Sequence, residues 1–308
     1  MNKILVVDIG GTNLRYAYAT KGAKTIDEPK KISLESIEKF NPLIQELIEN
    51  KNVDSLIISV AGPKVNGSIS MTNRDFSINE NELKTKFNLN SIFLLNDWES
   101  IGYSLSNMDE SEIEVIKKGK TFNQNSFFIG PGTGLGAALL INNTSVLPTE
   151  IGNTTGLAKT LIKNYNLDDE SNFTTLENVV SGTAISKIFE NKTGKIIKSE
   201  DVIKLFKEGD IIAKSVVDGF TKSLAEVMSD MALNYISGNG VYVAGSLMRT
   251  ITELMDKDKF AEHFIGNKKG LHRDLLEMIP IGLIKREHAP LIGNLNYFNI
   301  QNNLNQDT

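Results

Sequence analysis

Cysteine is absent from the 308-residue sequence, and only three histidines occur, His263, His272 and His288. Without a thiol the chain has no disulfide, no thiolate zinc site and no catalytic or redox cysteine. Three scattered histidines make a histidine-rich metal site unexpected. The formal net charge of −5 argues against a nucleic-acid-binding protein, which would show a basic stripe. An anionic ligand remains compatible with this charge, because backbone amides bind phosphate without side-chain charge.

Long hydrophobic runs are also missing. The apolar run Ile4–Val7 ends at Asp8, whereas a signal peptide needs a longer apolar core and a small-residue cleavage site. Residues 121–149 carry no charged side chain, but four glycines at alternate positions and two prolines would make them a poor membrane-spanning helix. We therefore expect a cytoplasmic protein that does not enter a membrane.

The sequence does have an ordinary globular composition, with 40% hydrophobic and 23% charged residues. At roughly 150 residues per domain, its length predicts about two domains. One pattern occurs twice, at 4–19 and at 127–141: a short buried strand, a glycine turn and a second strand. This repetition predicts two similar α/β halves. Apolar runs predict further buried strands at 55–60, 91–95 and 241–244, and helical spacing predicts helices at 37–50, 98–105 and 201–237, with a terminal helix from 294.

The second glycine turn formally matches a dinucleotide-binding pattern, because Gly132, Gly134 and Ala137 have the G-x-G-x-x-A spacing. That motif requires a helix directly after the turn. Here apolar residues continue without helical spacing as far as Asn142. We therefore interpret this glycine turn, like the first, as the tip of a hairpin.

Two hairpin tips of this kind offer a phosphate site. Thr12 and Thr133 each follow a glycine, and the amides of residues without a Cβ can converge on phosphate oxygens. The two tips could thus hold one polyphosphate from opposite sides. Asp8 lies beside the first tip and would repel phosphates unless a cation such as Mg²⁺ lay between them. The alternative is that each tip is only a turn and that Asp8 caps its own turn.

The polar pair Asn96-Asp97 follows the strand predicted at 91–95 and precedes a predicted helix. A side chain at this end of a strand can project into a cleft, where it could act on a substrate. Asn and Asp are also common caps at the start of a helix. The residues by themselves leave both interpretations open.

Seven segments resemble the motifs of a known enzyme family. Asp8–Arg15 resembles the first phosphate motif, Gly130–Gly136 the second, and Val241–Ser246 the adenosine motif of sugar kinases with the actin/hexokinase-type fold. The remaining four segments narrow the resemblance to the bacterial ATP-dependent glucokinase family: Met71–Asn73, Leu95–Trp98, Pro148–Asn153 and Glu177–Gly182. These segments follow the family's order over nearly the whole chain.

The resemblance implies an α/β protein with a two-domain actin/hexokinase-like (ribonuclease H-like) fold and a central cleft. We expect a small α/β domain at 1–106, onto which a C-terminal helix at 289–308 packs back, and a large α/β domain at 107–288. The implied activity is that of a glucokinase in glycolysis, which transfers the γ-phosphoryl group of Mg-ATP to the 6-hydroxyl of glucose. The implied cofactors are ATP and Mg²⁺, and a homodimer is usual for the family.

The resemblance also assigns roles to individual residues. Asp97 matches the catalytic base, which takes the proton of the sugar hydroxyl. The positions that match sugar contacts are Asn73, Asn96, Asp97, Glu150, Asn153 and Glu177. The positions that match nucleotide contacts are Asp8, Gly10, Gly11, Thr12, Asn13, Gly132, Thr133, Gly134 and Gly245. Asp8 would reach Mg²⁺ indirectly, through the ATP phosphates. Without the resemblance, Glu150 would be a loop acid and Glu177 an acid in the first turn of a helix.

The chain departs from the family pattern around both pockets. Asn153 stands where the family has a His that contacts the sugar, so its reach is shorter and it does not titrate. Ile151 replaces a Gly and would be strained if that position required a positive φ. Ser246 replaces the second Gly of the adenosine motif, and Thr183-Ala184 replaces Pro-Gly. Because Asp97 and both hairpins are intact, we expect an active kinase with glucose as the leading substrate.

Two alternatives to a glucokinase remain. Asn153 favours a kinase for another hexose or an amino sugar, such as mannose or glucosamine. A non-catalytic sugar-binding regulator on the same fold is the second alternative, and the retained Asp97 argues against it. Such a regulator would also need a DNA-binding module of roughly 50 residues, and we expect none ahead of residue 4.

Overall fold

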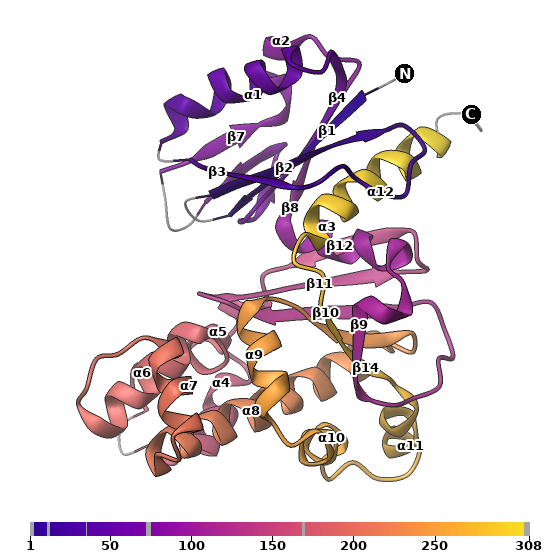
Figure 1. The fold of residues 1–308 in the computed structure, drawn as a ribbon. Coiled ribbons are helices and arrows are strands. Elements are labelled where there is room, and N and C mark those ends of the chain that lie inside the picture. Colours follow the sequence, from indigo (N-terminus) through magenta and orange to yellow (C-terminus); the bar gives the residue numbers. More distant parts are fainter. Residues whose placement is uncertain (1–2, 11–12, 35, 72–74, 168–169, 305–308) are drawn as a thin grey trace. The chain divides into compact units, whose positions relative to one another are not determined.

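The computed structural model describes residues 3–10, 13–34, 36–71, 75–167 and 170–304. The chain divides into two compact units, whose helices and strands are labelled in Figure 1. Unit 1 consists of Met1–Asp109, Thr144–Pro148 and His288–Thr308, and unit 2 consists of Glu110–Asn143 and Thr149–Glu287. The mixed α/β architecture predicted from the sequence is confirmed.

Unit 1 is built on a sheet with the strand order β3-β2-β1-β4-β8. Its strands are β1 (Lys3–Gly10), β2 (Asn13–Thr20), β3 (Lys30–Ser33), β4 (Val53–Val60) and β8 (Ser91–Asn96). The pair β1 and β2 is antiparallel, as expected for the first strand–glycine turn–strand unit, whereas β1, β4 and β8 are parallel. A three-stranded sheet contains β5 (Lys64–Val65), β6 (Ser68–Ser70) and β7 (Ser77–Asn79).

Helices cover both faces of the larger sheet in unit 1 (Figure 1). Successive side chains of a strand point to opposite faces. Leu5 and Val7 of β1 therefore belong to a core that includes residues of α1 (Phe40–Glu49) and α2 (Glu80–Phe87). Ile4 and Val6 belong to a second core with residues of α12 (Ala289–Leu304). A short 3₁₀ helix, η1 (Ile37–Lys39), precedes α1.

Helix α3 (Asp97–Ser104) approaches α12 at a distance that requires glycine. A Cβ added at Gly293 of α12 would lie 1.7 Å from the carbonyl oxygen of Ser100. Beside this contact, the buried Asn294 accepts a 2.6 Å hydrogen bond from Ser100 Oγ and donates one of 2.8 Å to the carbonyl oxygen of Val7. One buried amide therefore joins α12 to both α3 and β1.

In unit 2 the successive strands of the sheet are β11, β10, β13, β14 and β9. Their bounds are β9 (Ile113–Lys117), β10 (Ser126–Pro131), β11 (Leu135–Ile141), β13 (Gly240–Val243) and β14 (Ile281–Ile284). The antiparallel pair β10 and β11 confirms the second strand–glycine turn–strand unit. The chain passes from unit 1 to unit 2 within β12 (Ser145–Thr149).

The α-helices of unit 2 build a large core around the long and mostly buried α8. They are α4 (Ala158–Leu161), α5 (Leu176–Val179), α6 (Gly182–Thr193), α7 (Ser199–Lys207), α8 (Ile211–Tyr235), α9 (Ser246–Leu254), α10 (Lys257–Ile265) and α11 (Leu271–Met278). The 3₁₀ helices of unit 2 are η3 (Glu110–Glu112), η4 (Ile151–Asn153) and η5 (Ile162–Tyr165), whereas η2 (Leu105–Asn107) belongs to unit 1. In the described part of the chain, no helix combines the length and apolar character needed to cross a membrane.

The continuous helix expected at 201–237 is wrong, because the structure has two helices there, α7 and α8. They are separated at Gly209, whose φ of +88° lies in the left-handed region that favours glycine. Asp210 then caps α8, since its side chain accepts a 2.8 Å hydrogen bond from the amide of Ala213. The apolar periodicity continues across this break, so it conceals the boundary between the helices.

Lys117, the last residue of β9, binds the C-terminal end of α11. Its Nζ donates hydrogen bonds to the carbonyl oxygens of Glu277 and Ile279, each at 2.8 Å. Burial lowers the pKa of Lys117 to about 8, although the carboxylate of Glu277 opposes this shift. The ordinary pKa of a lysine side chain, which we take for the unfolded chain, is 10.5. Between these two values the unfolded chain binds more protons than the folded protein, so this group makes stability rise with pH.

We therefore expect the free energy of unfolding of the wild type, relative to Lys117→Met, to increase from about pH 8 to about pH 10.5. Parallel thermal or urea unfolding of both proteins across this range measures the difference. All other titrating groups are the same in the two proteins, so their contributions cancel in the difference between the two free energies of unfolding. The quantity to examine is how this difference changes with pH. A difference that stays flat or falls as the pH rises would contradict the assignment.

Candidate functional site

In unit 1, Asn96 ends β8 and caps α3. Its Oδ1 accepts hydrogen bonds from the amides of Trp98 at 2.8 Å and Glu99 at 3.2 Å, and its Nδ2 donates to the carbonyl oxygen of Gly62 at 2.7 Å. The Glu99 carboxylate accepts in turn from the Asn96 amide at 3.2 Å, which completes a capping box. The cap interpretation is thus confirmed for Asn96. One amide hydrogen of this buried side chain has no partner among the described residues.

Asp97 is the first residue of α3, directly after this cap. Its side chain is only partly buried, and its Oδ1 accepts a 3.0 Å hydrogen bond from the amide of Trp98. The carboxylate is therefore oriented by the start of a helix. A partly exposed carboxylate can accept a proton from a ligand hydroxyl.

Asp8 has two partners that the sequence analysis did not identify. Arg15 lies opposite Asp8 in the β1–β2 pair, and its Nη1 donates to Oδ2 at 3.1 Å. Ser59 lies opposite Asp8 in the β1–β4 pair, and its Oγ donates to Oδ1 at 3.1 Å. Burial raises the pKa of Asp8, while Arg15 and Ser59 oppose that shift. Asp8 is thus a paired carboxylate near the carboxyl end of β1.

In unit 2, the second glycine hairpin is bonded to the start of α6. The Gly182 amide donates to the carbonyl oxygen of Gly132 at 2.7 Å, and Thr183 Oγ1 donates to that of Thr133 at 2.7 Å. A Cβ at Gly182 would lie 2.9 Å from the carbonyl oxygen of Gly132, so the approach depends on glycine. The N-terminus of a helix attracts anions through its amides and its dipole. A glycine turn beside such an N-terminus suits a phosphate group.

This hairpin opens into a cavity of about 890 Å³ within unit 2. Gly132 and Thr133 line the cavity together with Ser246 of α9. Ser246 follows Gly245, whose φ of +106° again favours glycine. The structure therefore brings the second phosphate motif and the adenosine motif to one cavity. Its further lining residues are Gly182, Thr183, Ser186, Lys198, Ser199, Glu200, Ile203, Lys204, Lys207, Leu247 and Thr250.

Among the lining residues that the sequence analysis missed are three lysines, Lys198, Lys204 and Lys207. They come from α7 and the residue before it, and they give the cavity wall more positive than negative charge, since Glu200 is the single acid among the lining residues. A positive wall would favour a polyphosphate ligand. No sequence signal marked these lysines, because helical spacing does not tell which face of α7 borders a cavity.

Glu177 of α5 lies against the same glycine hairpin from another side. A Cβ at Gly134 would lie 2.7 Å from Glu177 Oε2, and a Cβ at Gly152 would lie 3.3 Å from it. No described residue donates a hydrogen bond to this carboxylate, so it can accept hydrogen bonds from a ligand. Burial raises the pKa of Glu150, and the nearby Glu177 carboxylate raises it further. The nearby Asn153 side chain opposes these shifts.

The departure at Ile151 causes no backbone strain. Ile151 is buried in η4 and does not have a positive φ. The sequence-based concern about this position is therefore wrong, because a 3₁₀ conformation accepts any L residue. Of the other predicted residues, Gly10 ends β1 and Asn13 begins β2, whereas Gly11, Thr12 and Asn73 lie outside the described residues. Among the described residues, no group of three or more His, Cys, Asp or Glu side chains is placed to hold a metal ion.

A family model described as Glucokinase matches residues 5–300. The chain belongs to the glucokinase family. The glucokinase of Saccharophagus degradans is 25% identical over 319 residues, with 95% of this chain and 97% of that protein covered. The crystal structure of a glucokinase from an Antarctic psychrotroph has a TM-score of 0.77 at 26% identity, and covers 96% of this chain and 98% of that one.

A glucokinase of the ROK family from Streptomyces griseus, solved in complex with glucose and AMPPNP, has a TM-score of 0.68 at 16% identity and covers 96% of this chain and 98% of that one. These structural matches confirm the predicted actin-like fold of hexokinase-type sugar kinases. The glucokinase family is a family of sugar kinases, and this protein therefore belongs among the sugar kinases. The family match extends over both units.

Proposed function

We propose that this member of the glucokinase family transfers the γ-phosphoryl group of Mg-ATP to the 6-hydroxyl of glucose. The observation that carries the proposal is the position of Asp97, a partly exposed carboxylate at the first position of α3, directly after the cap at the end of β8. The relative solved with glucose and AMPPNP supports the same pair of substrate classes.

On the acceptor side, Asp97 takes the proton of the sugar 6-hydroxyl as that oxygen attacks the γ-phosphorus. The bond from the γ-phosphorus to the bridging oxygen breaks, and ADP leaves. Asn96 offers its remaining amide hydrogen to a sugar hydroxyl. Glu177 and Glu150 accept hydrogen bonds from other hydroxyls, which carboxylates do strongly. Asn73 is assigned to the sugar by resemblance alone.

On the donor side, the hairpin at Gly132–Gly134 and the start of α6 bind the phosphates, and the cavity beside Gly245 takes the adenosine. In the first hairpin we assign Gly10, Gly11, Thr12 and Asn13 to the phosphates by resemblance. Mg²⁺ enters as part of the Mg-ATP substrate, in which phosphate oxygens supply most of its ligands. Asp8 fits an indirect contact with this Mg²⁺. Arg15 donates one hydrogen bond to Oδ2 and Ser59 donates one to Oδ1, so each carboxylate oxygen keeps a further lone pair that can accept a hydrogen bond.

A kinase for another hexose or an amino sugar is the second candidate, and one observation favours it. Asn153, which stands at the family's His position, donates its backbone amide to the carbonyl oxygen of Glu150 at 3.1 Å, and its side chain is near enough to lower the pKa of Glu150. The acceptor pocket therefore has an amide beside a carboxylate at this point. Such a pair has a different reach and a different donor pattern from a histidine, and it can select a different sugar.

The test is ADP release from Mg-ATP by the purified protein with glucose, mannose, fructose, glucosamine or no sugar. Sugar binding is followed in parallel through the fluorescence of Trp98, which is the single tryptophan of the chain and is adjacent to Asp97. We expect turnover that depends on glucose. Turnover with another sugar only would establish the second candidate. Binding of a sugar without any turnover would overturn both and favour a non-catalytic sugar-binding protein.

A further inference from the structure

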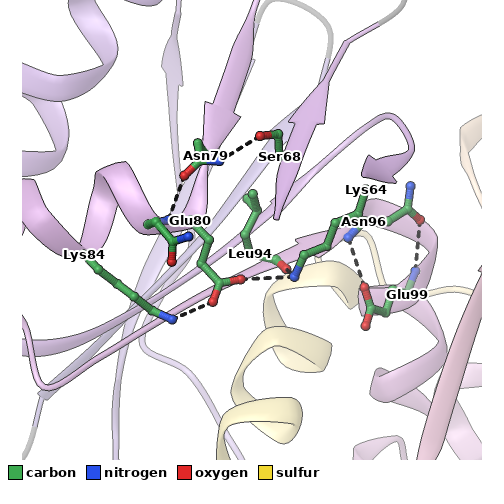
Figure 2. A network of polar contacts seen from close by, with 9 residues as sticks. Lys64, Ser68, Asn79, Glu80, Lys84, Leu94, Asn96 and Glu99 are labelled. Atoms are coloured by element: carbon green, nitrogen blue, oxygen red, sulfur yellow. Dashed lines mark hydrogen bonds and ion pairs between the residues drawn. The ribbon is translucent and has the colours of Figure 1, made fainter. Parts of the chain in front are cut away.

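Three hydrogen bonds hold the segment immediately before Asp97, and Figure 2 shows the two that involve charged side chains. Lys64 Nζ donates to the carbonyl oxygen of Leu94 at 2.6 Å, three residues ahead of Asp97. Glu99 Oε2 accepts from the Asn96 amide at 3.2 Å. The third bond runs from the Asn96 side chain to the carbonyl oxygen of Gly62. The segment that leads into α3 is therefore bonded to three different positions of unit 1.

Lys64 is itself held in place by a carboxylate. Glu80 of α2 accepts from Lys64 at 3.1 Å through Oε2 and from Lys84 at 2.7 Å through Oε1. Burial alone would raise the pKa of Glu80, but the bonds from Lys84 and Lys64 lower it below its usual range. Glu80 thus stays ionised and keeps the Lys64 ammonium beside the Leu94 carbonyl. Lys84 shares the carboxylate but has no contact with β8 in this network (Figure 2).

We propose that Lys64 and Glu99 are positioning residues for Asp97, which set the place and direction of its carboxylate by fixing the β8–α3 junction. This inference rests on the proposed function, in which Asp97 is the general base. Lys64 fixes the end of strand β8 through the carbonyl oxygen of Leu94, and Glu99 fixes the start of helix α3 through the backbone amide of Asn96. Neither needs to touch the substrate. A displacement of about 1 Å in a reacting group can lower a rate by as much as ~100-fold, so bonds of this kind matter for turnover.

A purely structural role would give a different result from a positioning role. If Lys64 only stabilised unit 1, its loss would lower the melting temperature without changing kcat in the folded enzyme. If it positions Asp97, its loss lowers kcat, while KM for Mg-ATP stays unchanged because the proposed donor site is made of other residues. Lys84 provides the matched control, because it forms a similar ion pair with Glu80 without binding the Leu94 carbonyl.

The experiment compares the full-length wild type with Lys64→Met, Lys64→Arg and Lys84→Met in the ADP-release assay, together with the melting temperature of each. We expect Lys64→Met to lower kcat about 10-fold, with KM for Mg-ATP within about twofold of wild type. Lys64→Arg should restore most of kcat, since a guanidinium can donate to both Leu94 and Glu80. Lys84→Met should leave kcat unchanged.

Glu99 gives an independent pair of variants. Glu99→Gln keeps an acceptor for the Asn96 amide, whereas Glu99→Ala removes it. We expect Glu99→Ala to lower kcat about 10-fold and Glu99→Gln to stay within about threefold of wild type. The comparison between the two variants remains informative even if the alanine variant is less stable.

Two results would overturn the positioning role. One is wild-type kcat in folded Lys64→Met and Glu99→Ala, and the other is an equal loss of kcat in Lys84→Met and Lys64→Met. If the wild type releases ADP with a sugar and either result is found, the proposed function stands and only the positioning role fails. If the wild type shows no sugar-dependent ADP release, the proposed function fails, and the positioning role fails with it.

Discussion

Asp97→Asn is expected to lower kcat at least about 100-fold, while sugar affinity falls much less. Asparagine has nearly the same size as aspartate, and its Oδ1 can still accept the hydrogen bond from the Trp98 amide. The start of α3 should therefore keep its conformation. An amide cannot take the proton of the attacking hydroxyl, so the variant lacks the base that the proposed function assigns to Asp97. The expected loss thus appears in kcat and not in binding.

Steady-state kinetics with the sugar identified by the substrate panel measures kcat, and Trp98 fluorescence measures sugar affinity. Glu82→Gln, at an exposed position in the first turn of α2, is the matched control and should behave like the wild type. Asp97→Asn with near-wild-type kcat would remove Asp97 from the role of base. A loss of sugar binding as large as the loss of kcat would instead make Asp97 a binding residue.

Gly293→Ala is expected to cause the largest loss of stability from a single added methyl group. Alanine favours a helix over glycine by about 1 kcal/mol, so the substitution would stabilise α12 in isolation. In the protein the new Cβ would lie 1.7 Å from the carbonyl oxygen of Ser100. That neighbour is helix backbone and cannot rotate away as a side chain could. α3 and α12 must therefore separate, and the hydrogen bonds of the buried Asn294 are disturbed with them.

Overpacking in a well-packed core costs about 1–3 kcal/mol, and a clash with backbone belongs at the upper end of that range or above it. The cost exceeds the gain in helix propensity, so we expect a melting temperature lower by roughly 5–10 °C. Gly156→Ala is the control, because a Cβ there meets nothing within 4 Å and the backbone has no positive φ. A Gly293→Ala protein as stable as the wild type would show that the two helices can move apart without cost.

Local sequence signals were sufficient for the two hairpins, for the buried strands β4, β8 and β13 and for the helix cap, but not for the shorter strands such as β3, β9 and β14. Both strand–glycine turn–strand units are present where the apolar runs and glycines placed them. The Asn96 cap was one of two interpretations that the residues allowed. The hydrogen bond that forms the cap joins Asn96 to Glu99, only three positions later in the chain. Patterns of this kind are readable because the interacting groups are neighbours in sequence.

The same method failed where a periodic pattern crossed a boundary. Apolar residues recur across Gly209 with a spacing that continues from α7 into α8, and one left-handed glycine separates the helices. The Asn-rich C-terminal segment forms the terminal helix that we expected, as α12, but its composition did not reveal that Asn294 is fully buried and bonded to Ser100 and Val7. Composition does not tell which asparagine has partners in the core.

The sequence by itself determined the fold class, the family and the two glycine hairpins, because these depend on local patterns and on the order of motifs along the chain. Only the tertiary structure decided the partners of the candidate site residues. Ser59 reaches Asp8 from 51 positions away in the chain, and Gly134 makes room for a carboxylate that α5 supplies. Lys64 binds a carbonyl 30 positions distant. Such contacts depend on strand register and on which helix face meets the sheet, and chain packing fixes both after the local elements have formed.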